Sequence, residues 1–280
     1  MRILLGVSSI AALLVGGGVV ASTHEPTTLE RIRATGIVRI AYTNEPPHSW
    51  RTREGRITGE SPEVARRVLH DMGVDSIEWV WSPFRSIFLE LRSGRVDLVA
   101  AGAYITPERA RDVRFTRPTI ELPTTLLVRA ADTSWLHSIE ELAARDDAVL
   151  AILAGSAERE LARQLKIDER RLVIVPDMEA GHAAVLSGRA HAFTASLVSA
   201  RMLRAHDGDS LRLAVMRAVP PGSPFEALGV GRSALVVRLD DDEFARMLDQ
   251  HLASYLGSPD HRALLARLGI SQDLAPVKSP

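Results

Sequence analysis

Arg109 is the residue whose type and position in this 280-residue sequence are best suited to hold an anion. It follows residues 106–108, whose threonine and proline are typical of the N-cap and first position of a helix. A strand is expected just upstream at residues 99–101, and Gly102 would let the backbone approach another group closely. Ligands of open α/β sheets collect at the carboxyl ends of strands, where a guanidinium offers a two-pronged donor for a carboxylate. We therefore predict that Arg109 anchors an anionic group.

Glu45 and His48 could form the opposite side of such a site. Both lie in residues 43–50, which follow an expected strand at residues 37–42 and contain two adjacent prolines that forbid a helix. This places the two side chains on a stiff loop at the carboxyl end of a strand. Glu45 could then balance the positive charge of a ligand, although from the residues alone an exposed loop acid is the alternative.

Three aromatic residues, Phe84, Tyr104 and Trp50, lie at turns and not at the spacing of a helix core. Stacked against a planar cation, such rings contribute about 1–2 kcal/mol each when water is excluded. Phe84 and Tyr104 are therefore candidates to line a binding site. For Trp50 and for Trp81, ordinary packing is an equally good interpretation.

An internal repeat indicates the architecture. Residues 91–102 and residues 185–196 each contain a helix end, the tripeptide Ser-Gly-Arg and a strand. The repeat predicts two α/β lobes, in which Gly102 and Ser196 end matching strands and face one cleft.

Ser156 is the further candidate from the second lobe. It follows an expected strand at residues 148–154 and precedes a helix expected at residues 157–165. We predict that it caps this helix, and that its hydroxyl and the N–H groups of the helix end form an anion site facing Arg109.

The order of the other expected elements favours parallel pairing. Strands at residues 37–42 and 77–81 alternate with a helix at residues 61–72, expected to be capped by Ser61, and a helix at residues 84–92. An apolar, β-branched strand at residues 124–128 is expected to cross to the second lobe, and the chain is expected to return near a proline-rich loop at residues 220–224. A further strand is expected at residues 235–239, and helices are expected at residues 240–257 and 259–268.

The N-terminus reads as an export signal. Residues 3–20 are apolar and small, and small residues around Ala21 suit a signal peptidase, so residues 1–24 are assigned to the signal. An uncleaved anchor is the alternative, because the run approaches the ~20 residues needed to span a bilayer; its glycines and serines favour cleavage. The lobes are expected at residues 25–127 plus 223–280 and at residues 128–222.

Composition excludes several classes of function. The chain has 34 basic and 35 acidic residues and a net charge of −1, so it lacks the excess of positive charge that is typical of proteins that bind nucleic acid or anionic lipid. It has no cysteine, which excludes disulfides, thiolate metal sites and lipid attachment through an N-terminal cysteine. The nine histidines lack metal-ligand spacing, and Gly229-Val230-Gly231 precedes a strand where a dinucleotide fingerprint requires a helix. No cofactor is expected.

Residues 102–109 and 113–118 resemble the ITPER…V.F..P segment of the polar-amino-acid family of periplasmic solute-binding proteins. With residues 43–47 and 59–65, the resemblance is closest to the ectoine- and hydroxyectoine-binding branch. It implies a two-lobe periplasmic-binding-protein-like (type II) α/β fold with a ligand cleft between the lobes, a monomer in the periplasm, and an ABC-transporter permease as partner. It also implies that Arg109 grips the ligand's carboxylate.

Two departures from the family pattern bear on the ligand. The wider family has an aspartate for an α-ammonium where this chain has Ser196, which leaves Glu45 as the counter-charge and suits a cyclic amidinium such as that of ectoine. His48 stands where the ectoine pattern has an aromatic. A polar amino acid is the alternative ligand, and a cyclohexadienyl-dehydratase-like enzyme, with Glu45 and His48 as acid and base, is the alternative function. The predicted ligand-binding set is Glu45, His48, Phe84, Gly102, Tyr104, Arg109, Ser156 and Ser196.

Overall fold

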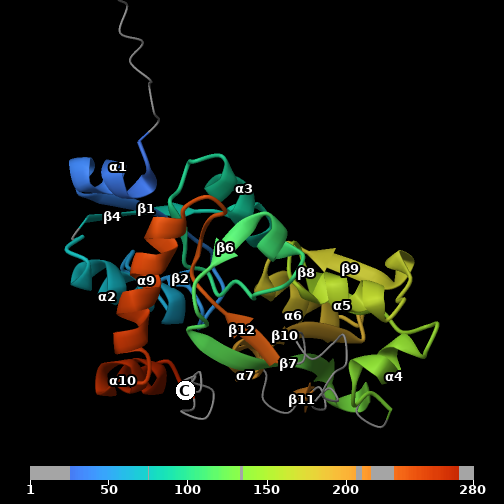
Figure 1. The fold of residues 1–280 in the computed structure, drawn as a ribbon. Helices are drawn as coiled ribbons and strands as arrows, with labels where there is room; N and C mark the ends of the chain where they lie inside the picture. Colours follow the sequence, from blue (N-terminus) through green and yellow to red (C-terminus); the bar gives the residue numbers. More distant parts are fainter. Residues whose placement is uncertain (1–25, 75, 133–134, 206–209, 216–229, 271–280) are drawn as a thin grey trace, which may run out of the picture.

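The fold consists of two α/β lobes that lie side by side (Figure 1). It is seen in a computed structural model that describes residues 26–74, 76–132, 135–205, 210–215 and 230–270. The predicted signal at residues 1–24, the loop at residues 220–224 and the lobe boundary at residues 222–223 lie outside the described residues. The two-lobe α/β fold class predicted from the sequence is confirmed.

The sheet of the first lobe contains segments from both ends of the chain. Its order is β4-β1-β5-β13-β6. As expected, β1 pairs in parallel with β4 and β5, whereas β13 runs antiparallel to β5 and β6. The strands are β1 (Ile37–Tyr42), β4 (Ser76–Trp81), β5 (Leu98–Val99), β6 (Val113–Phe115) and β13 (Val236–Arg238). Because β1 and β5 run in parallel, the loops that follow them reach the same edge of the sheet.

The second sheet has the order β11-β7-β10-β8-β9, with β12 paired to the start of β7. The long β7 is the predicted crossing strand, and the expected lobe boundary after residue 127 falls inside it. Strand β8 pairs in parallel with β10 and β9. The strands are β7 (Ile120–Arg129), β8 (Leu150–Leu153), β9 (Leu172–Val175), β10 (Ala192–Ser196), β11 (Leu211–Val215) and β12 (Val230–Ser233).

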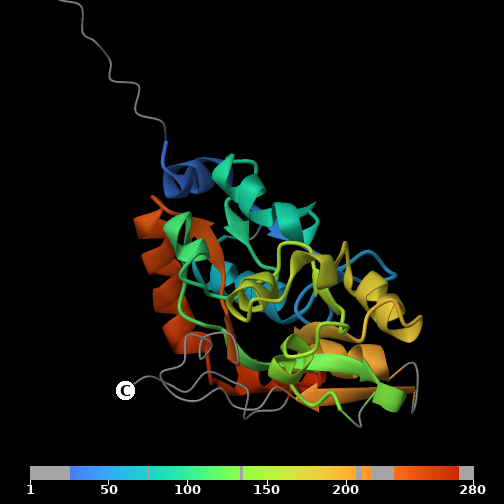
Figure 2. The same cartoon turned by 90° about the vertical axis from the view of Figure 1, so that its right-hand side faces the viewer.

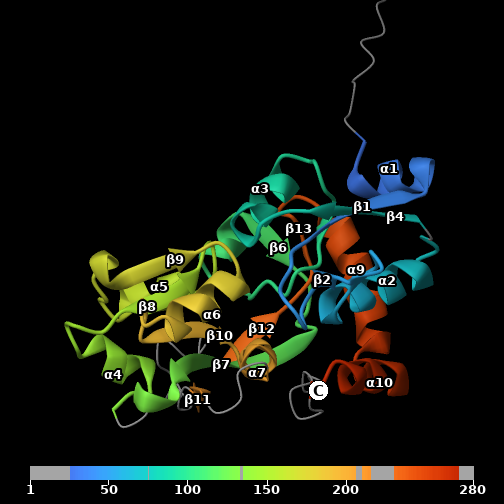
Figure 3. The ribbon, with the colours of Figure 1, turned by 180° about the vertical axis from the view of Figure 1, so that it is seen from behind.

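Helices cover both sheets. In the first lobe, α9 packs beside α1 and α2, and α10 packs against α2 (Figures 2 and 3). The first-lobe helices are α1 (Thr28–Thr35), α2 (Glu60–Asp71), α3 (Ile87–Arg92), α9 (Asp242–Tyr255) and α10 (Pro259–Arg267). The second-lobe helices are α4 (Ile139–Ala143), α5 (Glu158–Gln164), α6 (Met178–Leu186) and α7 (Leu197–Arg204). Shorter elements are the hairpin β2 (Trp50–Arg51) and β3 (Ile57–Thr58), and the 3-10 turns η1 (Phe84–Ser86), η2 (Arg109–Arg111), η3 (Ala130–Asp132) and η4 (Glu169–Arg171).

The start of α2 differs from the prediction. The helix begins at Glu60, after Gly59, and Ser61 is not its cap. The Ser61 hydroxyl instead donates to Glu60 (2.8 Å) and accepts the N–H of Gly102 (3.1 Å). This serine therefore holds the backbone of Gly102, which lies three residues after the end of β5.

One buried apolar cluster continues from one lobe into the other. It includes Ala41 and Phe84 of the first lobe and Leu153 and Phe193 of the second. The lobes thus meet through apolar contacts as well as polar ones.

The fully buried carboxylate of Asp97 lies at the centre of an ion cluster of partly exposed arginines that ties the N-terminal segment to the first sheet. Its carboxylate accepts from Arg39 Nη2 at 2.8 Å, pairs with Arg31, and lies 3.8 Å from Arg238 of β13. The cluster joins α1, β1 and β13, which are distant in sequence.

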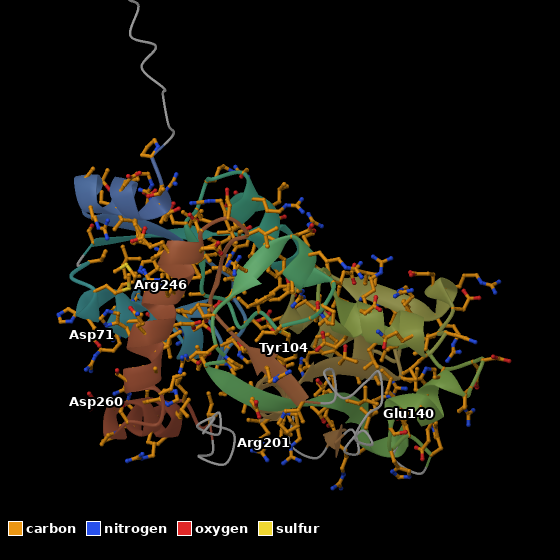
Figure 4. The ribbon with its side chains drawn as sticks, viewed as in Figure 1. Asp71, Tyr104, Glu140, Arg201, Arg246 and Asp260 are labelled. Carbon is orange, nitrogen blue, oxygen red and sulfur yellow. The ribbon has the colours of Figure 1, made fainter. Side chains whose placement is uncertain are left out.

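We expect Asp97→Asn to lower the free energy of unfolding by about 3 kcal/mol, because breaking a buried ion pair leaves the partner charges uncompensated. Asp71→Asn is the matched control: Asp71 lies on the surface of α2 (Figure 4) and pairs with Arg67 at 2.9 Å. It should change stability far less, because exposed pairs contribute little. Urea denaturation measures both, and equal losses would contradict the assignment.

Candidate functional site

A small chamber of about 20 Å³ lies between the lobes. Tyr104 marks its place at the centre of the molecule (Figure 4). A chamber of this size holds about one water molecule. It is lined by Glu45, His48, Phe84, Gly102, Tyr104, Arg109, Ser156 and Ser196, together with Leu153, Ala157 and Glu158. The structure therefore brings all eight predicted site residues to one place.

Arg109 bridges the two lobes. Its Nη1 donates to the carbonyl of Tyr104 at 2.8 Å, and its Nη2 donates to the carbonyl of Gly155 in the second lobe at 2.9 Å. The residue begins a 3-10 turn and not the expected α-helix, although Thr106 Oγ1 accepts its N–H at 3.2 Å as an N-cap would. Burial lowers the pKa of Arg109 to about 10, with Glu158 and Glu45 opposing the shift, so the side chain remains cationic.

Gly102 allows the backbone to approach His48. A Cβ atom at Gly102 would lie 2.6 Å from the His48 ring, and the residue has a φ of +71°. The ring is 1% exposed, and its Nε2 lies 3.0 Å from the hydroxyl of Ser196 in the second lobe. Burial lowers the pKa of His48 to about 4, so the ring is neutral at neutral pH. His48 thus forms a second polar contact between the lobes.

Glu45 is held by the backbone of its loop. Its N–H donates to the carbonyl of Ser49 at 2.7 Å, and its own carbonyl accepts the N–H of His48 at 2.9 Å. Burial raises the pKa of the Glu45 carboxyl to about 8; Glu158 adds to this shift and Arg109 opposes it. Glu45 is therefore mostly protonated at neutral pH in the chamber as it stands.

Ser156 does not cap α5 as predicted. The helix begins at Glu158 with Ala157 as the N-cap residue, which makes no side-chain cap bond. The local reason is that the Ser156 N–H donates to the carbonyl of Leu153 at 3.0 Å and closes a turn before the helix starts.

Three buried polar atoms of the chamber lack a hydrogen-bond partner among the described residues: Glu45 Oε2, His48 Nδ1 and Ser156 Oγ. Buried polar atoms are normally satisfied, and an unsatisfied one costs about 1–3 kcal/mol. Their convergence on one chamber fits a site that a polar ligand completes.

The aromatic lining differs from the predicted cage. Phe84 is 6% exposed, but its ring faces the Arg109 guanidinium, with the Arg109 Cζ 5.6 Å from the ring centroid. Phe88 lies on the same cation at 5.0 Å. Burial raises the pKa of the Tyr104 hydroxyl well above its usual value, so this ring is neutral. The described lining does not include Trp50.

Glu158 is the polar residue of the site that sequence reasoning missed. It is 8% exposed and lines the chamber from the first turn of α5. Acidic residues in a first turn are common because they complement the helix dipole, which gives such a residue an ordinary explanation. The signal that could have found it is its position two residues after Ser156, at the same strand end. Leu153 and Ala157 were missed too.

Residues 38–267 match the family described as bacterial extracellular solute-binding proteins, family 3, and the chain belongs to this family. It is 32% identical over 189 residues to the probable amino-acid ABC transporter periplasmic-binding protein y4tE of Sinorhizobium fredii, an alignment that covers 67% of this chain and 62% of that protein. The chain therefore spans less than two thirds of the length of y4tE. None of the helices in the described ranges combines the length and apolar character of a membrane span.

An enzyme and a solved structure are also similar. The chain is 24% identical over 237 residues to the cyclohexadienyl dehydratase of Pseudomonas aeruginosa, covering 83% of each protein. It matches the crystal structure of EhuB in complex with hydroxyectoine with a TM-score of 0.77 and 25% identity, over 87% of this chain and 92% of that one.

We expect Gly102→Ala to lower the free energy of unfolding by about 1–3 kcal/mol more than Gly94→Ala, the cost of overpacking against the His48 ring. Gly94 is the matched control, since its φ is +72° and a Cβ there would meet nothing within 4 Å. Both variants carry the same backbone strain, so the difference isolates the contact. Thermal denaturation measures it, and indistinguishable midpoints would show that the ring does not depend on Gly102.

Proposed function

We propose that the protein is the extracytoplasmic substrate-binding component of an ABC importer and binds a small zwitterion, with ectoine or hydroxyectoine as the first candidates. The observation that carries the proposal is the chamber itself, where Arg109 and three polar atoms without a partner among the described residues converge from both lobes. The similarity to y4tE supports the transport role, and the similarity to EhuB supports the ligand class. Export by a signal at residues 1–24, a periplasmic location, a monomer and a permease partner belong to the same proposal.

In this scheme Arg109 receives the ligand's carboxylate. Its guanidinium now donates to two backbone carbonyls, which are weaker partners than a carboxylate. Ser156 Oγ supplies a further donor to the same group. Because the chamber holds about one water, the lobes have to separate for the ligand to enter, and the ligand then favours the closed arrangement by its contacts with both lobes.

The cationic end of the ligand would face Glu45, with Phe84, Tyr104 and His48 around it. Ser196 offers a hydroxyl and no carboxylate, so the carboxyl that the second lobe brings to the chamber is that of Glu158. A polar amino acid remains the alternative ligand. A thermal-shift screen of ectoines, amino acids and betaines separates these ligand classes.

Arg109→Lys should weaken ectoine binding by about 100-fold, because lysine keeps the charge but loses the planar fork that pairs with a carboxylate. Arg111→Lys, an exposed residue of the same 3-10 turn, is the control and should leave the affinity unchanged. Isothermal titration calorimetry measures both affinities. Undiminished affinity in Arg109→Lys would show that the Arg109 guanidinium does not bind the ligand's carboxylate.

A dehydratase is the second candidate function, favoured by one observation. Glu45, with a pKa of about 8, and neutral His48, with a pKa of about 4, line the same chamber as a protonated acid and an unprotonated base. The 24% identity to cyclohexadienyl dehydratase extends over most of both chains.

If the protein is a transport component, arogenate and prephenate should show no turnover above the buffer rate. Ultraviolet absorbance follows loss of the cyclohexadienyl ring, and the His48→Ala variant provides the blank. A rate that exceeds the buffer, and that falls in His48→Ala, would establish the enzyme instead.

A further inference from the structure

Gly231, the second glycine of the Gly-Val-Gly segment, lies in β12 beside the start of β7 (Figure 1). Ser233 of the same strand forms an antiparallel bridge with Tyr104, and the Ile105 N–H donates to the carbonyl of Arg232 at 2.9 Å. The buried residues of β12 are Gly231 and Ser233, which lie on one face of the strand. This pairing makes Tyr104 and Gly231 diagonal neighbours across the two segments.

The Tyr104 ring leaves no room for a side chain at Gly231. A Cβ atom there would lie 2.2 Å from Cε2 and 2.3 Å from Cζ of the ring. The backbone of Gly231, unlike that of Gly102, does not adopt the left-handed conformation that favours glycine. The requirement for glycine at position 231 therefore comes from the ring, which would have to move if any other residue stood there.

The position of the ring is also fixed on the side of Arg109. The Tyr104 carbonyl accepts Arg109 Nη1 at 2.8 Å, so the backbone that carries the ring is bonded to the proposed carboxylate anchor. The tyrosine is 8% exposed and belongs to a buried apolar cluster that includes Leu126 and Ala157 of the second lobe. The ring thus stands at a set place relative to Arg109, at the centre of the molecule (Figure 4).

We propose that Tyr104, packed on Gly231, is the residue that determines ligand size, because its ring limits how far a ligand held by Arg109 can extend. This inference rests on the proposed function and narrows its ligand to a compact zwitterion without a long side chain. Tyr104 lines a chamber of only about 20 Å³. Replacing its phenol by a methyl group would add the volume of the ring to the chamber and admit a longer molecule.

Ectoine and L-arginine are suitable probes, because both are carboxylates with a delocalised cation and L-arginine is the longer molecule. In a packed pocket, one methylene group more or less changes discrimination by about 10- to 200-fold. The wild type should therefore prefer ectoine. Tyr104→Ala should shift the ratio of the two dissociation constants at least about tenfold towards L-arginine. Gly231→Ala should weaken ectoine binding about tenfold, because it displaces the ring.

The first measurement tests the contact between the ring and Gly231 and needs no ligand. Thermal denaturation of the wild type, Gly231→Ala, Tyr104→Ala and the double variant forms a double-mutant cycle. Gly231→Ala should lower the unfolding midpoint by about 5 °C when Tyr104 is present. It should leave the midpoint unchanged in the Tyr104→Ala background, where the added methyl group meets no ring. Equal losses in both backgrounds would overturn the inference.

The second measurement is calorimetric titration of the same proteins with ectoine and with L-arginine. Gly181→Ala is the matched control, because Gly181 of α6 also lacks a left-handed φ and a Cβ there would lie 2.5 Å from the Phe193 ring. The described lining of the chamber does not include Phe193. This variant should lose stability in both Tyr104 backgrounds and keep the wild-type ratio of dissociation constants.

The outcomes separate this inference from the proposed function. A ratio that is unchanged in Tyr104→Ala, or a wild-type preference for L-arginine, would overturn the size limit and leave the transport proposal standing. Because the readout is a ratio, a general loss of affinity in a variant does not imitate the expected shift. A wild type that binds neither probe would overturn the proposed ligand class and the size limit with it, whereas the stability cycle would still decide whether the ring packs on Gly231.

Discussion

The guanidinium of Arg109 is the interaction on which the site depends, because it is bonded to both lobes at once. One nitrogen donates to Tyr104 in the first lobe and another to Gly155 in the second. The rings of Phe84 and Phe88 lie against it. In such surroundings charge interactions are stronger than in water. The state of this one cation therefore affects both the closure of the lobes and the charge balance of the chamber.

The chamber combines several features that cost stability, and under the proposed function a ligand would offset them. Three buried polar atoms without described partners, and a carboxyl that has to hold a proton, are unfavourable features in a closed protein. A packed core would replace them with apolar groups. All of them line one cavity between the two lobes. Under the proposed function, a ligand that satisfies them together would favour the closed arrangement.

Much of the fold could be predicted because local signals and tertiary structure agree. The strand at residues 37–42 was predicted with the bounds of β1, and the repeat predicted that Ser196 ends a strand, as it does in β10. Gly102 was also expected to end its strand, but β5 ends three residues earlier, at Val99. The failures lie where a side chain has a tertiary partner. Ser61 was expected to cap a helix, but its hydroxyl bonds to the N–H of Gly102, which is 41 residues away in the sequence. No local pattern can report such a contact.

The set of residues at the site was more predictable than their interactions. Residue types at strand ends identified Glu45, His48 and Arg109 as neighbours, because parallel strands bring their carboxyl ends to one edge. The protonation of Glu45 and His48 depends on how deeply the two lobes bury them, and that of Glu45 also depends on how near Glu158 lies. Neither can be predicted from the sequence alone. Glu158 itself has an ordinary local explanation as a helix-start acid. Its effect on the Glu45 carboxyl arises only when the second lobe closes over the first, so the chemistry of this site is a property of the two lobes together.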